Sequence, residues 1–564
     1  MLQRTMSNSP ARKKWCLGPG FYSRWAALAA SFLVNAFTLY SYAFGLFSDT
    51  LKDELGFSQS NVDIIASVGE LGLWSTFVVG LMLERISPRQ VYVVGSATSA
   101  LGLGYVSLAI GKILPTNPAS MAAMFYLANF GTACYAQTAQ STAVRNFPAA
   151  DRGKVSGLIK SVFGLSSAVL SVLYTGLFGA EHVGRFLLLL SVGVPLLGMV
   201  SSVPLNLVPA KHLSYAIERA QGVSPGLTPF YIWFAVMTLF LMAAVCAVLF
   251  PFALPVPWAG ILLVIVVLSA SALPLRYGRV YIRGKVFEHS RESSTSNSFC
   301  VEPDPRIGGD ATDSVSAESP LEEDLFGGEL FPLLGSMDGL GAGRNADIES
   351  CSLTWEQCLR DKRFWALFVS FLCGAGSGLV VINNVASITA SLEMTSSTLL
   401  VTALGISNAL GRITTGWLSD RIVTAGLPRS LLYCGMLLLT SGVDFLLAAG
   451  IKSLLYPLCV VAGLCYGSMF SLVLALTGDL FGAEHIGTNY GLLDLGPAVG
   501  SFVFATGVVN LFYEKGQLTP DCIGPQCFGG TFLCTAVACL CACAIVFVVL
   551  VRPGFKARMR RAQL

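Results

Sequence analysis

Four ionisable side chains lie inside long apolar stretches of the sequence: Glu70, Lys160, Arg412 and Asp494. A charge is costly in such surroundings, so an ionisable residue there marks a pathway for a solute or an ion unless it has a structural partner. A carboxyl can carry a proton, because desolvation favours its neutral form. A guanidinium presents a planar fork of donors that matches a carboxylate. These residue types indicate solute binding and proton transfer.

Each of the four also has a structural explanation. Lys160 can extend its stem to the membrane surface, and Arg412 can brace the Asp420 segment that follows it. Asp494 fits the first turn of a helix, where the helix dipole favours an anion. Glu70 can pair within the protein. The sequence contains no recognisable nucleophile–base pair and no zinc spacing, so we expect no enzyme, no metal and no other cofactor.

The rest of the chain indicates what positions these side chains. Its 564 residues are 54% hydrophobic and 12% charged, and the mean hydropathy is +0.66. Soluble domains carry about twice that charged fraction. The apolar residues form blocks of roughly 20, long enough to cross a bilayer as helices. We therefore predict an all-α polytopic membrane protein whose partners are lipid and a small solute, not nucleic acid.

Fourteen segments are predicted to span the membrane, as six, then two, then six. They lie at about 24–47, 62–83, 91–111, 119–141, 155–178, 186–208, 229–250, 257–275, 364–388, 397–418, 430–449, 453–476, 489–512 and 529–551. The predicted domains are an N-terminal tail (1–23), a first half (24–208), an extra hairpin (209–275), a linker (276–362), a second half (363–551) and a C-terminal tail (552–564). The linker is rich in serine, glycine and acidic residues, which predicts disorder.

Basic residues predict the orientation. Of the 36 Lys and Arg residues, 29 fall on the side of the termini and five on the other side, which places both termini and the linker in the cytoplasm.

Within the linker, Glu329, Leu333 and Leu334 fit an acidic dileucine signal for a sorting adaptor. A chance match in a low-complexity tract explains the same letters. Both a plasma membrane and an endosomal or vacuolar membrane fit the sequence.

The two predicted halves are internal repeats. The segment Gly80–Arg85 follows the second span, and Gly416–Arg421 follows the tenth at an offset of 336 residues. Phe147 and Phe481 begin a second pair of matching segments, with an offset of 334. The same offset of 334 relates Lys160 to Asp494, so the repeat places opposite charges at equivalent positions.

Two six-helix halves with G-x-x-x-[DE]-R after each second helix resemble the major facilitator superfamily. The first copy departs from that pattern, with Glu84 for the usual Asp and Ser87–Pro88 for a Gly-Arg pair. The resemblance implies that helices two, five, eight and eleven line the contact between halves, and these hold the four ionisable residues. We expect seven charged residues to couple or gate the halves: Glu70, Glu84, Arg85, Lys160, Asp420, Arg421 and Asp494.

A narrower resemblance is to the nodulin-like branch. It covers nearly everything except the two tails and the linker, with the nodulin-like region at about 21–275. It is carried by Ala128–Gly131, Ala139–Gln140, Val144–Pro148, Arg152–Ser166 and, in the second half, Gly374–Asn384. That branch has an extra hairpin after its sixth helix, which matches the predicted central pair. The resemblance implies a solute transporter without naming the solute.

Arg412 lies four residues before the motif glycine and resembles the anion-binding arginine of monocarboxylate transporters, which favours an organic anion. Neutral polar residues within spans would complete the pocket, although many of them fit helix–helix hydrogen bonds equally well. They are Asn35, Tyr40, Asn129, Tyr135, Gln137, Asn383, Asn384, Asn408 and Tyr466.

We therefore expect a secondary transporter that works by alternating access and uses proton coupling. The alternative is a transporter-like receptor or scaffold that signals through its linker. Cys522 and Cys527 flank four residues in the last exterior loop, where they would form a disulfide if that side is oxidising.

Overall fold

The computed structural model describes residues 24–40, 44, 48–178, 182–205, 207, 224–249, 352–393, 398–516 and 523–553. Every regular element within those ranges is a helix, which confirms the all-α class. Both tails, the predicted span at 257–275, the sorting residues Glu329, Leu333 and Leu334, and Cys522 lie outside the described residues.

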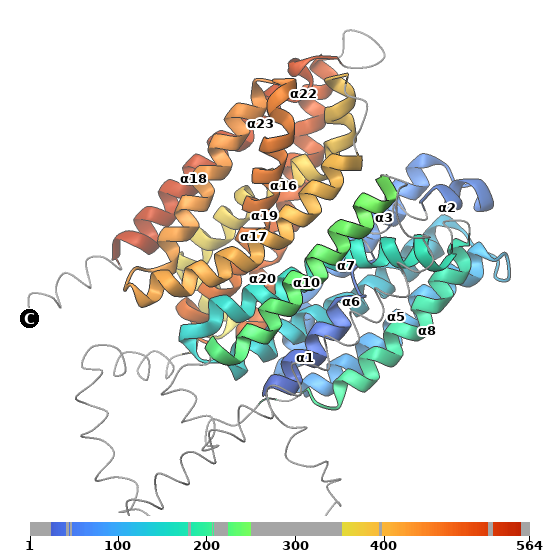
Figure 1. Ribbon diagram of the computed structural model, residues 1–564, viewed down its shortest axis with the longest axis horizontal. Helices are drawn as coiled ribbons and strands as arrows, with labels where there is room; N and C mark the ends of the chain where they lie inside the picture. The colour runs from blue at the N-terminus through green and yellow to red at the C-terminus, as the bar shows by residue number, and fades with distance from the viewer. Residues whose placement is uncertain are drawn as a thin grey trace, which may run out of the picture.

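The first half is an antiparallel bundle coloured blue to cyan-green in Figure 1. Its helices are α1 (Arg24–Asn35), α2 (Ser48–Leu55), α3 (Gln59–Leu73), α4 (Thr76–Arg85), α5 (Pro88–Ile110), α6 (Pro118–Asn146), α7 (Arg152–Phe178) and α8 (Val183–Ser202). Helix α10 (Ser224–Leu249) follows it.

The second half is coloured yellow to red. It contains α15 (Trp355–Arg360), α16 (Lys362–Ser391), α17 (Thr398–Thr424), α18 (Arg429–Ala448), α19 (Lys452–Phe481), α20 (Ile486–Leu493), α21 (Leu495–Gly500), a π-helical segment (Ser501–Val508), α22 (Val509–Gly516) and α23 (Gly529–Val546). Thirteen of the fourteen predicted spans thus contain helices over all or part of their length, and the remaining one lies outside the described residues.

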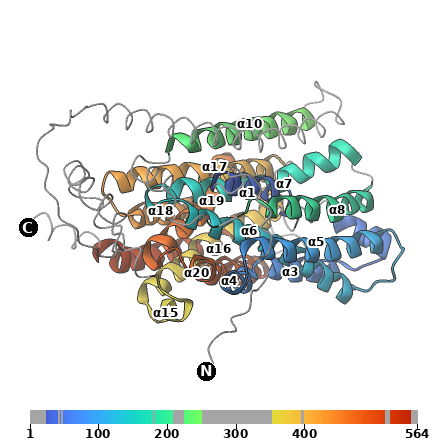
Figure 2. The same ribbon diagram turned by 90° about the horizontal axis from the view of Figure 1, so that it is seen from below.

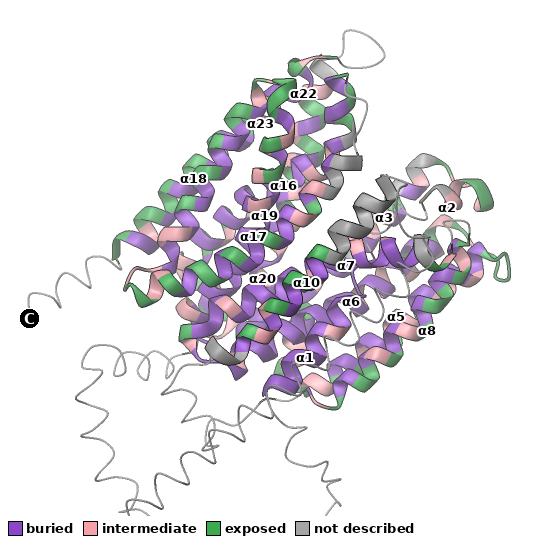
Figure 3. Ribbon diagram, in the orientation of Figure 1, coloured by how far each residue is buried: buried purple, intermediate pink, exposed green. Residues whose placement is uncertain are grey.

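The surface of the bundle is that of a membrane protein. Nine helices in the described ranges are long and apolar enough to cross a membrane. Large apolar side chains such as Leu196, Leu239 and Leu438 are half exposed or more on the outer helices. Figure 3 shows exposed residues along the outward faces of α5, α8, α18 and α23. Lipid is the environment that this apolar belt requires.

The internal repeat is visible in how the halves meet. Helix α17 packs on α7, and α4 packs on α20. A Cβ on Gly416 would lie 2.4 Å from the carbonyl oxygen of Gly153, and one on Gly80 would lie 2.5 Å from that of Gly487. The two contacts are equivalent under the repeat, because both pairs of glycines keep its offsets. We call the end of the bundle where α4 and α17 finish, at Glu84 and Asp420, the motif end.

The predicted span at 24–47 is wrong in its second part. Helix α1 ends at Asn35, and residues 38–40 are not helical. Side chains of neighbouring helices satisfy the released backbone groups. The Thr132 hydroxyl donates to the carbonyl of Thr38 at 2.6 Å, and the Leu39 amide donates to Ser166 Oγ at 2.9 Å. Non-helical backbone is tolerated at membrane depth where the protein itself supplies such partners.

Two helices of the contact between halves are interrupted. A turn at Trp74 and Ser75 separates α3 from α4, and the Ser75 hydroxyl donates back to the carbonyl of Leu71 at 2.8 Å, a bond that bends helices. Asp494 separates α20 from α21. Pro497 follows three residues later and cannot donate to the carbonyl of Leu493, which explains the interruption.

Figure 2 shows α10 on one face of the bundle and α15 on the opposite face. Helix α10 contacts α7 of the first half and α17 of the second, and the Tyr231 hydroxyl donates to the carbonyl of Lys154 at 3.2 Å. Helix α15 begins inside the segment predicted to be disordered, so disorder cannot extend to residue 362. The Leu353 amide bonds the carbonyl of Phe481 at 2.9 Å and anchors this stretch to α19.

Candidate functional site

A small cavity, of about 30 Å³, lies between the two halves, beside both helix interruptions. Side chains from α3, α4, α6, α7, α17, α19 and the α20–α21 break surround it. They are Leu73, Trp74, Thr76, Ala136, Gln140, Lys160, Phe163, Arg412, Phe470 and Asp494. Three of the four ionisable residues singled out in the sequence therefore meet in one place.

Arg412 links the two halves at this cavity. It is buried, and its Nε donates to Asn408 Oδ1 at 3.0 Å. One terminal nitrogen donates to the backbone carbonyl of Lys160 across the interface at 2.8 Å. The guanidinium carbon lies 5.0 Å from the centre of the Phe470 ring. No partner within the described residues is recorded for the other terminal nitrogen, which leaves one donor edge available to a ligand.

Lys160 supplies a second buried cation. Its Nζ lies 4.7 Å from the centre of the Tyr490 ring and 5.4 Å from that of Phe470. Both rings present their π faces, which attract a cation without neutralising it. The structure thus places this amine in the cavity and not at the membrane surface.

Asp494 is the single carboxylate of the cavity lining. The Tyr490 hydroxyl donates to its Oδ1 at 2.9 Å, and Oδ2 has no recorded hydrogen bond in the part of the chain that the structure describes. Asp494 forms no direct ion pair with Lys160, although the two charges interact. With two cations and one carboxylate ionised, the lining carries a net charge of +1.

Glu70 does not line this cavity. It lies on α3 three residues before Leu73 and is partly buried. Its side chain has no hydrogen bond or ion pair to any described residue. Glu70 therefore lies about one helical turn before Leu73, the cavity residue of α3, and is not grouped with the other three predicted charges.

The other predicted polar residues do not line the cavity, and several of them bond within the protein. Tyr40 bonds Ser99 and Tyr135 bonds Ser96, whereas Gln137 donates to the carbonyl of Gly487 in the opposite half. Asn35, Asn129 and Asn384 each donate to a carbonyl one turn earlier in their own helix. Asn383 bonds Ser501, Asn408 accepts from Arg412, and Tyr466 packs on Phe470.

The motif end is closed by Asp420. Its carboxylate accepts the backbone N–H groups of Gly153 at 2.9 Å and Lys154 at 2.8 Å, at the start of α7 in the opposite half. Arg429 donates to the same carboxylate and also to the carbonyl of Ala149 across the interface. Asp420 and Arg429 are both buried, so water does not compete for these bonds.

The repeat produces a second, weaker closure. Glu84 accepts from the Thr488 hydroxyl and contacts His485 Nδ1 at 3.2 Å, at the start of α20. Thr488 and Lys154 are equivalent under the offset of 334. The Glu84 side chain remains 31% exposed, against 1% for Asp420. Arg85 and Arg421 lie on the surface, and Arg421 stacks on Trp417.

Several residues of these sites were not predicted as site residues, among them Gln140, Arg429 and His485. Gln140 lines the cavity, and Arg429 and His485 belong to the two closures. For His485 a signal was present, because the repeat places its segment opposite the first motif. Gln140 lies in the stretch that resembles the nodulin-like branch, but nothing in the sequence indicated that Gln140, and not Gln137, lines the cavity.

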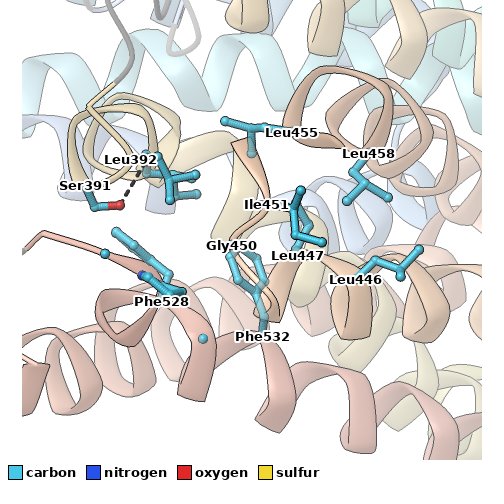
Figure 4. A pocket seen from close by; sticks show the side chains of 14 residues that line it. Ser391, Leu392, Leu446, Leu447, Gly450, Ile451, Leu455, Leu458, Phe528 and Phe532 are labelled. Carbon is cyan, nitrogen blue, oxygen red and sulfur yellow. Dashed lines mark hydrogen bonds between the residues drawn. The ribbon is translucent and has the colours of Figure 1, made fainter. Parts of the chain in front are cut away.

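A second pocket occupies the opposite end of the second half, among α16, α18, α19 and α23. Figure 4 shows its walls, formed by leucines, Ile451, Phe528 and Phe532. The Ser391 hydroxyl bonds the carbonyl of Ile388 within its own helix. No ionisable residue lines this pocket, so it lacks the groups that would recognise a charged solute. The same end holds Cys527, which is disulfide-bonded, and its partner lies outside the described residues.

Comparison with known proteins places this architecture in context. The "Nodulin-like" family model matches residues 24–274, and the "NFD4, C-terminal domain" model matches residues 349–558. Protein NUCLEAR FUSION DEFECTIVE 4 of Arabidopsis thaliana is 25% identical over 91% of this chain and 86% of its own length. Probable transporter MCH1 of Gibberella zeae is 27% identical over 31% of this chain and 38% of that protein.

Among solved structures, the major facilitator proton:xylose symporter XylE aligns over 94% of this chain and 95% of its own. The TM-score is 0.52 at 11% identity, so the two share a fold, and nothing about the solute follows from the likeness.

Proposed function

Because this chain belongs to the nodulin-like branch of the major facilitator superfamily and is a secondary transporter, we propose that its solute is a small organic monoanion. The observation that carries the proposal is the meeting of Lys160, Arg412 and Asp494 in one buried cavity between the halves. A monoanion would balance the net charge of +1. With a neutral solute, one buried positive charge would instead remain uncompensated, which is costly in a low-dielectric site.

The shape of the arginine supports a carboxylate. Two of its nitrogens are held by Asn408 and by the backbone of Lys160, so the guanidinium cannot rotate freely. A fixed planar fork recognises a carboxylate with directed, charge-assisted bonds. Leu73, Trp74, Phe163 and Phe470 form the remaining walls of the cavity and suit the carbon skeleton of such an anion.

Alternating access is supported by the position of the cavity relative to the closures. The cavity lies at the interface between repeats, where transporters of this kind bind their solutes. Asp420 and Glu84 hold the halves together on one side of it. We propose that release of both closures exposes the cavity to the motif end.

Proton coupling is assigned to Glu70, with Asp494 as the second carboxyl. Glu70 lies within an apolar helix and has no cationic partner among the described residues, a setting in which protonation is favoured. Protonation of Glu70 would add a charge of +1 to the transported complex and offset that of a monoanion. The cycle would then move a neutral pair.

The experiment that tests the proposal uses the full chain purified and reconstituted into vesicles. Exchange of labelled monocarboxylates against an internal pool should be saturable, and neutral sugars of similar size should not compete. If neutral solutes compete and carboxylates do not, the organic-anion proposal is wrong. Specific carboxylate binding without any flux would instead favour the receptor alternative.

The orientation follows from the basic residues and is also a proposal. Both termini and the linker would lie in the cytoplasm, so the motif end would face it. Epitope tags at residue 1 and at the C-terminus should be inaccessible in intact cells. Labelling of either tag without permeabilisation would overturn this orientation.

A further inference from the structure

Gln140 is a buried polar side chain that the proposed mechanism does not use. It lies on α6, lines the cavity between the halves and is 2% exposed. Its Oε1 is fully enclosed and has no hydrogen-bond partner. Its Nε2 makes no recorded bond to a described residue either. A buried amide without partners loses its hydration and gains nothing in exchange, which is destabilising unless a ligand completes it.

A second acceptor lies in the same cavity. Asp494 uses Oδ1 to accept from Tyr490, and Oδ2 has no recorded partner in the described ranges. The cavity lining therefore includes two cationic donors, Lys160 and Arg412, and two residues with an unpaired acceptor, Gln140 and Asp494. A simple carboxylate would satisfy the donors and leave both acceptors unpaired.

We propose that Gln140 determines specificity and that the solute is a hydroxy acid, whose carboxylate lies against the two cations while its hydroxyl donates to Gln140. This inference rests on the proposed function of the same cavity. The overall charge of the solute indicates whether the donor is a hydroxyl or an ammonium group. An amino acid is neutral overall, so it would leave the net charge of +1 unbalanced, whereas a hydroxy acid balances it.

The test uses acids that share a carbon skeleton and differ in one group. Binding of propionate, 2-hydroxypropionate, pyruvate and alanine to the purified full chain is measured by titration calorimetry. A second pair, 3-phenylpropionate and 3-phenyllactate, covers a larger skeleton. We expect each hydroxy acid to bind about 5- to 150-fold more tightly than its parent, because the parent leaves a buried acceptor unpaired. Pyruvate should resemble propionate, since its carbonyl only accepts.

Two variants attribute the preference to Gln140. Gln140→Met keeps the length of the side chain and removes both polar atoms, so the preference for the hydroxyl should fall to within about twofold of unity. Thr138→Val is the matched control, because Thr138 Oγ1 is also buried and unpaired on α6 but does not line the cavity. The control should keep the wild-type preference.

The outcomes separate this inference from the proposed function. Equal binding of propionate and 2-hydroxypropionate by the wild type, or an unchanged preference in Gln140→Met, overturns the inference and leaves the organic-anion proposal standing. Tighter binding of alanine than of 2-hydroxypropionate overturns the hydroxyl assignment. If no acid of either skeleton binds but a neutral polyol does, the proposed function itself is wrong. The wild-type series decides the first point even if Gln140→Met fails to fold.

Discussion

Replacing Asp420 with asparagine should open the motif end. The carboxylate accepts two backbone N–H groups at the start of α7, where the helix dipole also favours a negative charge. A hydrogen bond to a charged group contributes about 1.5–3 kcal/mol. An asparagine oxygen can keep one of these bonds in neutral form and loses the other. We therefore expect the closed state to lose about 2–3 kcal/mol, which raises the open population roughly 30- to 150-fold.

The equivalent change in the second closure of the motif end is the control. Glu84→Gln alters a contact whose side chains are 31% and 26% exposed. Contacts of this kind contribute about 0.2–1 kcal/mol, so opening should increase by about fivefold or less. The two variants remove the same charge at equivalent positions of the repeat and differ in burial.

A cysteine at Ser141 reports the opening. Ser141 is buried at the interface, and its Oγ lies 3.2 Å from the position that a Cβ on Gly487 would occupy. The rate at which a hydrophilic maleimide labels Ser141→Cys is followed by peptide mass spectrometry, because Cys534 and Cys541 are also exposed. A rate in Asp420→Asn within threefold of that in the parent would refute the reasoning. Unchanged thermal unfolding is required of both variants.

Three further outcomes are expected. Arg412→Lys should weaken binding of a carboxylate about 30- to 150-fold by calorimetry, because the fixed fork is lost. The surface change Arg421→Lys should leave this binding unchanged. A loss of affinity below threefold in Arg412→Lys would show that Arg412 is a structural clamp. Glu70→Gln should abolish accumulation driven by a pH gradient while exchange between equal pools persists, and retained accumulation would exclude Glu70 as the proton carrier. Gly416→Ala should lower thermal stability by about 1–3 kcal/mol, since its Cβ would meet α7 at 2.4 Å. Gly435→Ala, with no atom within 4 Å, should be neutral or slightly stabilising, and equal effects would contradict the packing argument.

Much of the fold was predictable because its signals are local. Apolar blocks indicated the spans. Constant offsets indicated the repeat and showed that Lys160 and Asp494 occupy equivalent positions in the two halves. Both residues face the interface because equivalent helices pack equivalently. The end of α1 at Asn35 was not predictable, since the backbone there is satisfied by hydroxyls of α6 and α7 more than 90 positions away.

The site was only partly predictable for a related reason. Which polar residue of α6 faces the cavity depends on the rotation of that helix in the bundle. Gln137 and Gln140 lie three residues apart on α6, yet one bonds the opposite half and the other lines the cavity. Asn129 and Tyr135 are also polar residues in the apolar stretch of this helix, but they do not line the cavity. Spacing alone cannot fix that rotation when most of the helix is buried.

The interruptions at Ser75 and Asp494 have a mechanical consequence. A continuous helix transmits any tilt along its whole length, whereas an interrupted one can pivot where the backbone hydrogen bonds are already missing. The segments beyond the two pivots can therefore fold over the cavity while Asp420 still clamps the motif end. We expect each half to move as two parts joined at its pivot. The segments over the cavity and the closure at the motif end would then open in succession. A state open to both sides, which would let protons leak across the membrane, is then avoided by the order of the movements.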